Sequence, residues 1–269
     1  MINKTFHHNI HHMMVSDSAN NNGTREKVCI LIPMTSRDQN WLAIADTCIA
    51  RYALPSLEAT ITSSDVVKYE YTAYAGYDTS DTFFTSADDV RLHKANRKFK
   101  LVLKSFDNPL QKPGPVMNGL SLVAYNDGCD YMYRINDDTE LLTPAWTTRF
   151  IDVLLQYDPP LVGVVGPACH EGNTAILTHD FVHRTHLDIF SLHHYPPVLT
   201  DYWLDDWITQ VYGENRTKKL PDVSVIHRLN PMRYVVNFAN QASLANEVQT
   251  GGRAIAQHVL GGHQQRPFG

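Results

Sequence analysis

The chain has 269 residues, of which 43% are hydrophobic and 19% charged, so it is long enough to bury the core of one sizeable α/β domain. Its formal net charge of −5 disfavours a protein that binds nucleic acid by neutralising the phosphate backbone. No run approaches the roughly eighteen apolar residues of a membrane span, and the N-terminal region holds no signal-peptide core. We therefore expect a cytoplasmic protein or a soluble domain of a larger protein.

The four cysteines of the chain, Cys29, Cys48, Cys129 and Cys169, are far apart in the sequence. Three of them lie in or beside apolar runs, and no two form a C-x-x-C pair. This pattern is typical of reduced thiols in a core rather than of a dense disulfide framework. It predicts a reducing compartment.

The elements predicted in chain order alternate between strands and helices. Residues 1–25 are polar without a sustained apolar period, and we expect them to form a disordered tail. Strands are predicted over residues 28–33, 66–77, 99–104, 129–135 and 161–167. Helices are predicted over residues 38–52, 85–98, 116–128 and 145–157, the second of them opening with a capping signature from Ser86 to Asp89. This alternation predicts βαβ units and a mostly parallel, doubly wound sheet, which binds ligands beyond the carboxyl ends of its strands.

The strand predicted over residues 129–135 runs directly into three polar residues, Asn136, Asp137 and Asp138. Two adjacent carboxylates at a strand end have three interpretations. They can cap a helix or form a turn, hold a divalent cation that removes their mutual repulsion, or act as an acid and base pair. The residues alone leave all three open.

The surroundings of these carboxylates resemble GT-A glycosyltransferases. Residues 117–141 are similar to the segment in which an Asn-Gly-bearing helix is followed by an apolar strand and a D-x-D motif. The likeness extends to residues 28–37, 75–81, 161–167 and 202–213. It implies an α/β GT-A fold, with a Rossmann-like, mostly parallel sheet flanked by helices in a single domain over residues 26–237. Residues 238–269, with glycine pairs at 251–252 and 261–262, are expected to form peripheral helices or a linker.

The resemblance implies a metal site that holds Mn²⁺ or Mg²⁺. Asp138 matches the metal-binding acid of the motif, and His227 matches a histidine that completes the site in many of these enzymes. A strand-end histidine bonded to backbone is the alternative for His227. Asn136 replaces the first acid of the motif, so it and Asp137 are assigned to nucleotide contacts.

Four further residues are implied to bind the nucleotide sugar, for which UDP-sugar is the favoured donor. Asp78 matches an acid that contacts base or ribose, although aspartate is also common in turns. Thr35 and Arg37 follow the first strand and would meet uracil or phosphate, for which arginine offers a bidentate fork. Asn118 matches the asparagine of the family's helix.

The resemblance also places a catalytic base and an acceptor site in the second half of the chain. Asp205 and Asp206 begin a tryptophan-containing helix, and we favour Asp206 ahead of Asp205 as the base. Residues 168–190 are dense in His, Asp and Thr. The spacing of His179 and His183 fits a zinc pair, but no H-E-x-x-H motif is present. We expect an acceptor-binding loop instead. In it, His179 and Asp180 would bond sugar hydroxyls while Trp203 stacks on a sugar face or, alternatively, packs in the core.

The sequence thus predicts a metal-dependent glycosyltransferase that moves a sugar from a nucleotide donor to a hydroxyl of a glycan acceptor. Inversion is favoured, and a retaining enzyme is the alternative. A sugar nucleotidyltransferase would need a glycine-rich basic loop after the first strand, and residues 32–41 contain no glycine. A non-catalytic carbohydrate-binding module is the alternative from another class. Neither a nucleic acid partner nor a membrane-spanning segment is expected.

Overall fold

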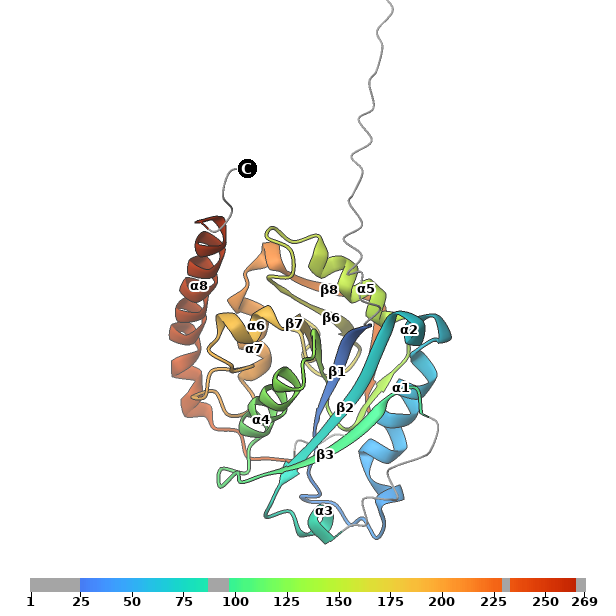
Figure 1. The fold of residues 1–269 in the computed structure, drawn as a ribbon. Helices are drawn as coiled ribbons and strands as arrows, with labels where there is room; N and C mark the ends of the chain where they lie inside the picture. Colours follow the sequence, from blue (N-terminus) through green and yellow to red (C-terminus); the bar gives the residue numbers. More distant parts are fainter. Residues whose placement is uncertain (1–24, 87–96, 229–232, 265–269) are drawn as a thin grey trace, which may run out of the picture.

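A computed structural model of the chain describes residues 25–86, 97–228 and 233–264 (Figure 1). Apart from Arg25, the tail predicted over residues 1–25 lies outside the described residues, as does most of the helix predicted over 85–98. Ser86, the expected N-cap of that helix, belongs instead to a preceding short helix.

One eight-stranded sheet forms the centre of the molecule, in the order β3-β2-β1-β4-β7-β6-β8-β5. Its strands are β1 (Glu26–Pro33), β2 (Tyr69–Asp78), β3 (Lys100–Phe106), β4 (Tyr131–Arg134), β5 (Thr139–Leu141), β6 (Val164–Cys169), β7 (Asp180–His183) and β8 (Thr217–His227). The first four strands in this order are parallel, as predicted. The other half is mixed, because β7 runs antiparallel to both β4 and β6 and β5 runs antiparallel to β8.

Helices cover both faces of the sheet (Figure 1). They are α1 (Leu54–Thr60), α2 (Ser63–Lys68), α3 (Thr82–Ser86), α4 (Pro113–Asn126), α5 (Trp146–Leu155), α6 (Thr185–Ile189), α7 (Leu204–Val211) and α8 (Gln241–Gln264). Shorter turns lie at Ile44–Asp46, Ile49–Ala53, Glu214–Arg216 and Phe238–Asn240. Among the described residues, none of the helices combines the length and apolar character needed to cross a bilayer.

Side chains of β1 point alternately to the two faces of the sheet, and the core forms one layer on each face. Val28, Ile30 and Ile32 join the cluster on the side of α1 and α5, where Trp146 and other aromatic residues pack. Cys29 and Leu31 face the opposite cluster, which includes the hydrophobic residues of α4 and α7. Because successive side chains of a strand point to opposite faces, a strand buried on both faces reads as one continuous apolar run.

Three helical segments differ from the sequence prediction. The strand predicted from residue 66 begins only at Tyr69, because Thr62 and Asp65 form a capping box that starts α2. The helix predicted over 38–52 is broken into a short 3₁₀ turn and a π-helical turn that leads into α1. Helix α8 runs as one helix through both glycine pairs, in the segment where shorter peripheral helices or a linker were expected.

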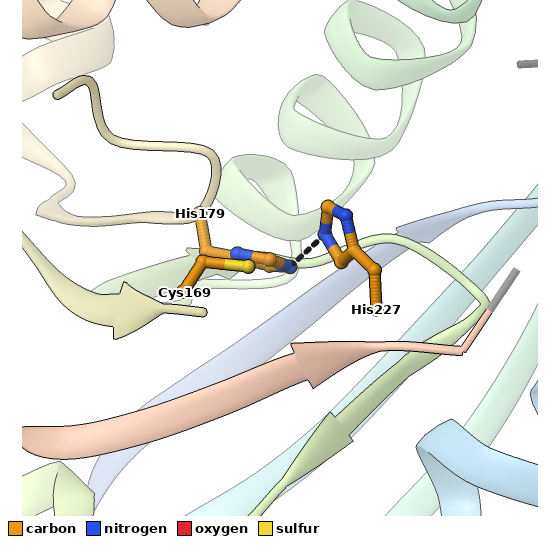
Figure 2. Close-up of side chains that lie close together, drawn as sticks. All are labelled: Cys169, His179 and His227. Atoms are coloured by element: carbon orange, nitrogen blue, oxygen red, sulfur yellow. Dashed lines mark hydrogen bonds between the residues drawn. The ribbon is translucent and has the colours of Figure 1, made fainter. Parts of the chain in front are cut away.

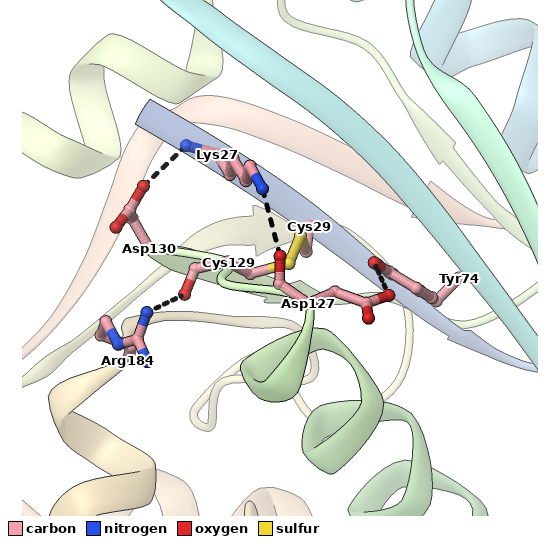
Figure 3. Close-up of a disulfide and its surroundings, with 7 residues drawn as sticks. All are labelled: Lys27, Cys29, Tyr74, Asp127, Cys129, Asp130 and Arg184. Atoms are coloured by element: carbon pink, nitrogen blue, oxygen red, sulfur yellow. Dashed lines mark hydrogen bonds between the residues drawn. A yellow bond between two sulfur atoms is a disulfide. The ribbon is translucent and has the colours of Figure 1, made fainter. Parts of the chain in front are cut away.

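A disulfide between Cys29 and Cys129 joins β1 to the turn before β4 (Figure 3). The expectation that these two cysteines are reduced thiols is therefore wrong, and the prediction of a reducing compartment loses its basis. The cause is spatial: β1 and β4 are neighbours in the sheet, so cysteines far apart in sequence come to a Cα–Cα distance of 6.0 Å. Cys48 and Cys169 are free and buried.

The two ends joined by the disulfide are also held by hydrogen bonds. The backbone N–H of Lys27 donates to Asp130 Oδ2 at 2.8 Å, and Lys27 Nζ donates to the carbonyl of Asp127 at 3.1 Å. The hydroxyl of Tyr74 donates to Asp127 Oδ2 at 2.7 Å. Figure 3 shows these contacts around the disulfide beside β1.

Candidate functional site

A pocket of about 400 Å³ opens beyond the carboxyl ends of the parallel strands. This edge of the sheet is where open α/β folds place their ligands. The pocket brings together eight of the thirteen site residues predicted from the sequence, and these are Thr35, Arg37, Asp78, Asn136, Asp137, Asp138, Asp205 and His227. Strand ends and helix starts supply most of them, which explains how positions nearly two hundred residues apart converge.

The polar loop after β1 is fixed by Asp81. The backbone N–H of Ser36 donates to Asp81 Oδ2 at 2.8 Å, and the Ser36 hydroxyl donates to Asp81 Oδ1 at 2.7 Å. Arg37, which follows, donates from Nη1 to the carbonyl of Gln111 at 3.1 Å and lies 4.0 Å from Asp78 Oδ2. Burial raises the pKa of Asp78, while a hydrogen bond from Asn108 and the charge of Arg37 oppose that shift.

Asp137 forms an ion pair with Arg233. Its carboxylate is almost completely buried and accepts hydrogen bonds from both terminal nitrogens of Arg233. Arg233 also donates to the carbonyl of Thr35 at 2.8 Å, so the pair ties the motif after β4 to the loop after β1. Burial raises the pKa of Asp137, and the charge of Arg233 counteracts it. Asp137 therefore reaches the pocket as half of an ion pair, whereas the sequence predicted a nucleotide contact.

Asp138 and Asn136 lie on either side of this ion pair. The backbone N–H of Asn136 donates to Thr139 Oγ1 at 3.1 Å, and its side-chain nitrogen lies 3.4 Å from His227 Nε2. The carbonyl of Asp138 accepts from the backbone N–H of Arg228 at 3.0 Å, while its side chain lines the pocket. Asp138 does not cap a helix, since the short strand β5 follows at Thr139.

The described lining of the pocket is acidic. It holds six carboxylates and four cationic side chains, which gives a net charge of −2 with histidine neutral. Each cation lies within 4.0 Å of a different carboxylate, in the pairs Arg37–Asp78, Lys112–Asp201, Arg134–Asp205 and Arg233–Asp137. Asp138 and Glu171 are the other two carboxylates. Such a pocket would repel a diphosphate unless a divalent cation accompanied it, so the donor set fits a hard cation at Asp138.

Asp205, in the first turn of α7, points into the pocket and pairs with Arg134 at 2.8 Å. Burial raises the pKa of Asp205 to about 6 despite the opposing charge of Arg134. Asp206 is half-buried and does not belong to the pocket lining. The geometry thus brings Asp205 to the pocket rather than the favoured Asp206, because adjacent residues of a helix point in directions about 100° apart.

The predicted acceptor-binding residues lie outside the pocket lining. His179 and Asp180 are completely buried, because the segment expected to be a loop contributes β7 to the centre of the sheet. Asp180 accepts hydrogen bonds from His194 Nε2 at 2.7 Å and from the Tyr195 hydroxyl at 2.5 Å. Trp203 is half-buried, and its indole N–H donates to the carbonyl of Asn237.

Asn118 also serves the structure. Its side-chain oxygen accepts the backbone N–H groups of His194 and Tyr195, both at 2.9 Å. Its side-chain nitrogen donates to the carbonyl of Tyr195 at 3.0 Å. Asn118 therefore anchors the loop before α7 to α4. It lies outside the pocket lining, although the sequence analysis assigned it to the nucleotide sugar.

His227 takes part in a cluster with His179 and Cys169 (Figure 2). The Nε2 atoms of the two rings are 3.1 Å apart, and Thr139 Oγ1 lies 2.8 Å from His179 Nε2. Burial lowers the pKa of both histidines, and the positive charge of Arg134 adds to the effect. Both rings are therefore neutral near pH 7.

Sequence reasoning missed Glu171 and three of the four cations of the pocket, which are Lys112, Arg134 and Arg233. Arg134 carried a usable signal, because a lone arginine inside the apolar strand of residues 129–135 must find a buried acidic partner. Arg233 and Lys112 lie in irregular segments of mixed composition, where nothing local marks them as pocket residues. Glu171 accepts the backbone N–H of His227 at 3.0 Å, a contact that depends on β6 and β8 being neighbours.

Comparison of the chain with protein-family models and with curated proteins finds no match. Among solved structures, the chain is similar to S. aureus TarS, with a TM-score of 0.53 and 14% identity over 90% of this chain and 44% of that one. It is also similar to S. aureus TarS 1–349 in complex with UDP, with a TM-score of 0.50 and 13% identity over 84% of this chain and 65% of that one. The chain thus spans less than two-thirds of the length of either structure. These similarities confirm the fold predicted from the sequence: the chain has a GT-A fold, in which helices flank a single mixed sheet.

Proposed function

We propose that the protein is a glycosyltransferase that moves a sugar from a nucleoside-diphosphate donor, with UDP-sugar favoured, to a hydroxyl group of a glycan acceptor. The observation that carries this proposal is the convergence of Asp138, His227 and Asp205 on one pocket at the carboxyl edge of the sheet. A similar fold solved in complex with UDP supports the choice of donor.

Asp138 would hold a divalent cation, Mn²⁺ or Mg²⁺, with His227 as the second ligand suggested by the sequence. When bound, such a cation offsets the charge that builds up on the departing diphosphate. Hard cations of this kind need only one or two carboxylates when substrate phosphates supply the other oxygens. The acidic lining of the pocket favours the metal and the diphosphate binding together, because the metal would offset both the charge of the diphosphate and the net negative charge of the lining.

The nucleotide would lie between the loop after β1 and the end of β2. Arg37 offers its guanidinium to uracil or phosphate, and Asp78 offers a carboxylate to base or ribose. Asn136 offers an amide that both donates and accepts, and Thr35 belongs to the same wall. The hydrogen bonds that Asp81 and Arg233 make to this loop hold it in place before the ligand binds.

Asp205 would act as the base. The acceptor oxygen attacks the anomeric carbon, the bond from that carbon to the diphosphate oxygen breaks, and the hydroxyl proton passes to the Asp205 carboxylate. Arg134 holds this carboxylate in position at 2.8 Å. A single displacement of this kind inverts the anomeric carbon, which is the stereochemistry that we favour.

The test is the release of nucleoside diphosphate from a panel of nucleotide sugars in the presence of Mn²⁺. Turnover of at least one donor, lost with EDTA and with Asp138→Ala, would support the proposal. Asp206→Asn is the control, since Asp206 lies next to the proposed base but outside the pocket lining. Glycan binding with no turnover of any donor would overturn the proposal in favour of a non-catalytic carbohydrate-binding module.

A further inference from the structure

We propose that Cys169, His179 and His227 form a second metal site, for a soft divalent ion such as Zn²⁺, in the wall behind the pocket. These side chains come from three neighbouring strands of the mixed half of the sheet. Cys169 ends β6, His179 immediately precedes β7, and His227 ends β8. The proposal does not depend on the transferase reaction, because it concerns the ion alone.

The spacing of the donor atoms suits one ion. One ligand atom from each residue lies within 4.8 Å of the other two, and the two Nε2 atoms are 3.1 Å apart. Two nitrogens bound at about 2.0–2.1 Å to a tetrahedral zinc ion would be about 3.3 Å apart. Figure 2 shows the thiol of Cys169 and the ring of His179 both extending toward the ring of His227.

The chemistry of this donor set differs from that of Asp138. One thiolate and two imidazoles favour zinc over Mn²⁺ or Mg²⁺, which prefer oxygen ligands. A hydrogen bond between the rings links the two histidines, and the thiol beside them donates to Glu171 Oε2 at 3.9 Å.

Two further groups contact the cluster, and a route of access is present. Glu171 Oε2 lies 3.9 Å from Cys169 Sγ, and Thr139 Oγ1 lies 2.8 Å from His179 Nε2. His227 and Glu171 line the pocket, so an ion would reach the buried thiol from that side. Binding would release the proton of the Cys169 thiol. The resulting thiolate, together with Glu171, would offset the repulsion between the ion and Arg134.

The site would give the pocket two ions of different character. A soft ion bound to Nε2 of His227 would replace the role proposed above for this histidine, so the hard cation would be held by Asp138 and the diphosphate without it. Cys169 and His179 would then be ligands of the soft ion only. This separation makes the proposal testable without any nucleotide.

The experiment uses the full chain stripped with EDTA and titrated with Co²⁺ or Zn²⁺. We expect a thiolate-to-cobalt charge-transfer band with the visible bands of tetrahedral cobalt, and an X-ray absorption spectrum of the zinc-loaded protein with one sulfur and two nitrogen ligands. Cys169→Ser should abolish the band and weaken zinc binding at least about tenfold. Cys48→Ala is the matched control, because Cys48 is also free and buried, and it should keep the band. Asp138→Asn should keep it as well.

Two outcomes would overturn the proposal. One is a zinc-loaded spectrum with only oxygen and nitrogen ligands, which needs no variant and so does not depend on the folding of a mutant protein. The other is a cobalt band that survives in a folded Cys169→Ser protein. Loss of donor turnover in Asp138→Ala with the cobalt band intact would separate this site from the proposed transferase chemistry.

Discussion

The ion pair between Asp205 and Arg134 sets the pH at which the proposed base can work. Burial raises the pKa of Asp205 to about 6, and the charge of Arg134 at 2.8 Å limits the rise. A base must be unprotonated to accept a proton, so activity should increase as the pH rises through about 6. We expect kcat/KM of the wild-type protein to follow this limb when it is measured from pH 5 to pH 8.

Substitution should show which of the two adjacent acids, Asp205 or Asp206, acts as the base. Asp205→Asn should lower kcat by about 10²–10⁴ and remove the limb near pH 6, because the amide cannot accept the proton. Asp206→Asn should leave both the rate and the limb within a few-fold of the wild type. If the effects are exchanged between the two variants, the base is Asp206 and the original preference from the sequence was correct.

The pair of Asp137 and Arg233 should be important for stability. Replacing Arg233 with Met would leave the Asp137 carboxylate buried without its cation, at a cost of about 3–5 kcal/mol in the free energy of unfolding. The double variant Arg233→Met/Asp137→Asn should recover part of that loss, because the charge is removed together with its partner. Urea denaturation measures both. A loss below about 1 kcal/mol in the single variant would mean that solvent reaches Asp137 and replaces the guanidinium.

At the scale of elements, the glycine pair in the middle of α8 offers a matched test of helix packing. A Cβ added to Gly251 would overlap Val211 Cγ2 and approach Trp207 of α7 at 3.4 Å, whereas a Cβ added to Gly252 meets nothing within 4 Å. Gly251→Ala should therefore push α8 away from α7 and destabilise the protein. Gly252→Ala should stabilise it by about 0.5–1 kcal/mol, because alanine favours the helix.

Thermal unfolding of the two variants measures whether their stabilities change in opposite directions. Both substitutions add the same methyl group to the same helix, so any difference in sign must come from contacts outside the helix. Equal stabilisation of both would mean that α8 does not rest against α7 as closely as the structure shows.

Elements with a strong local signal were predictable, and those decided by distant partners were not. The apolar run of β1 and the glycine after α4 mark their elements, and Gly128 has the positive φ of +79° that such a helix end favours. Asp180 shows the opposite case. Its segment reads as a polar loop, but β7 is inserted between β4 and β6, where Asp180 finds His194 and Tyr195 as partners.

The candidate site divides in the same way at the scale of the whole molecule. Strand ends meet at one edge in any parallel sheet, so the convergence of Asp78 and Asp138 could be predicted from the order of elements alone. The partners of the acids in the pocket could not. Arg233 reaches Asp137 across 96 positions of sequence, and the choice of Asp205 over Asp206 depends on how α7 is rotated about its axis. Neither property leaves a trace in local composition.

The disulfide between Cys29 and Cys129 acts on the whole chain, since it closes a loop across 100 positions of sequence. A cross-link of this span limits the freedom of the unfolded chain and should stabilise the protein by about 2–5 kcal/mol. The double variant Cys29→Ala/Cys129→Ala should lose this amount in urea denaturation.

The folded structure should change little when the bond is absent, because hydrogen bonds from Lys27 to Asp127 and Asp130 already hold the same two ends together. We therefore expect the double variant to keep its donor turnover at temperatures below unfolding, while reductant lowers the stability of the wild type alone. Alkylation followed by mass spectrometry of the unreduced protein is the decisive control. Free thiols at both positions would contradict the bond, and the span that it closes would then contribute nothing to the stability of the sheet.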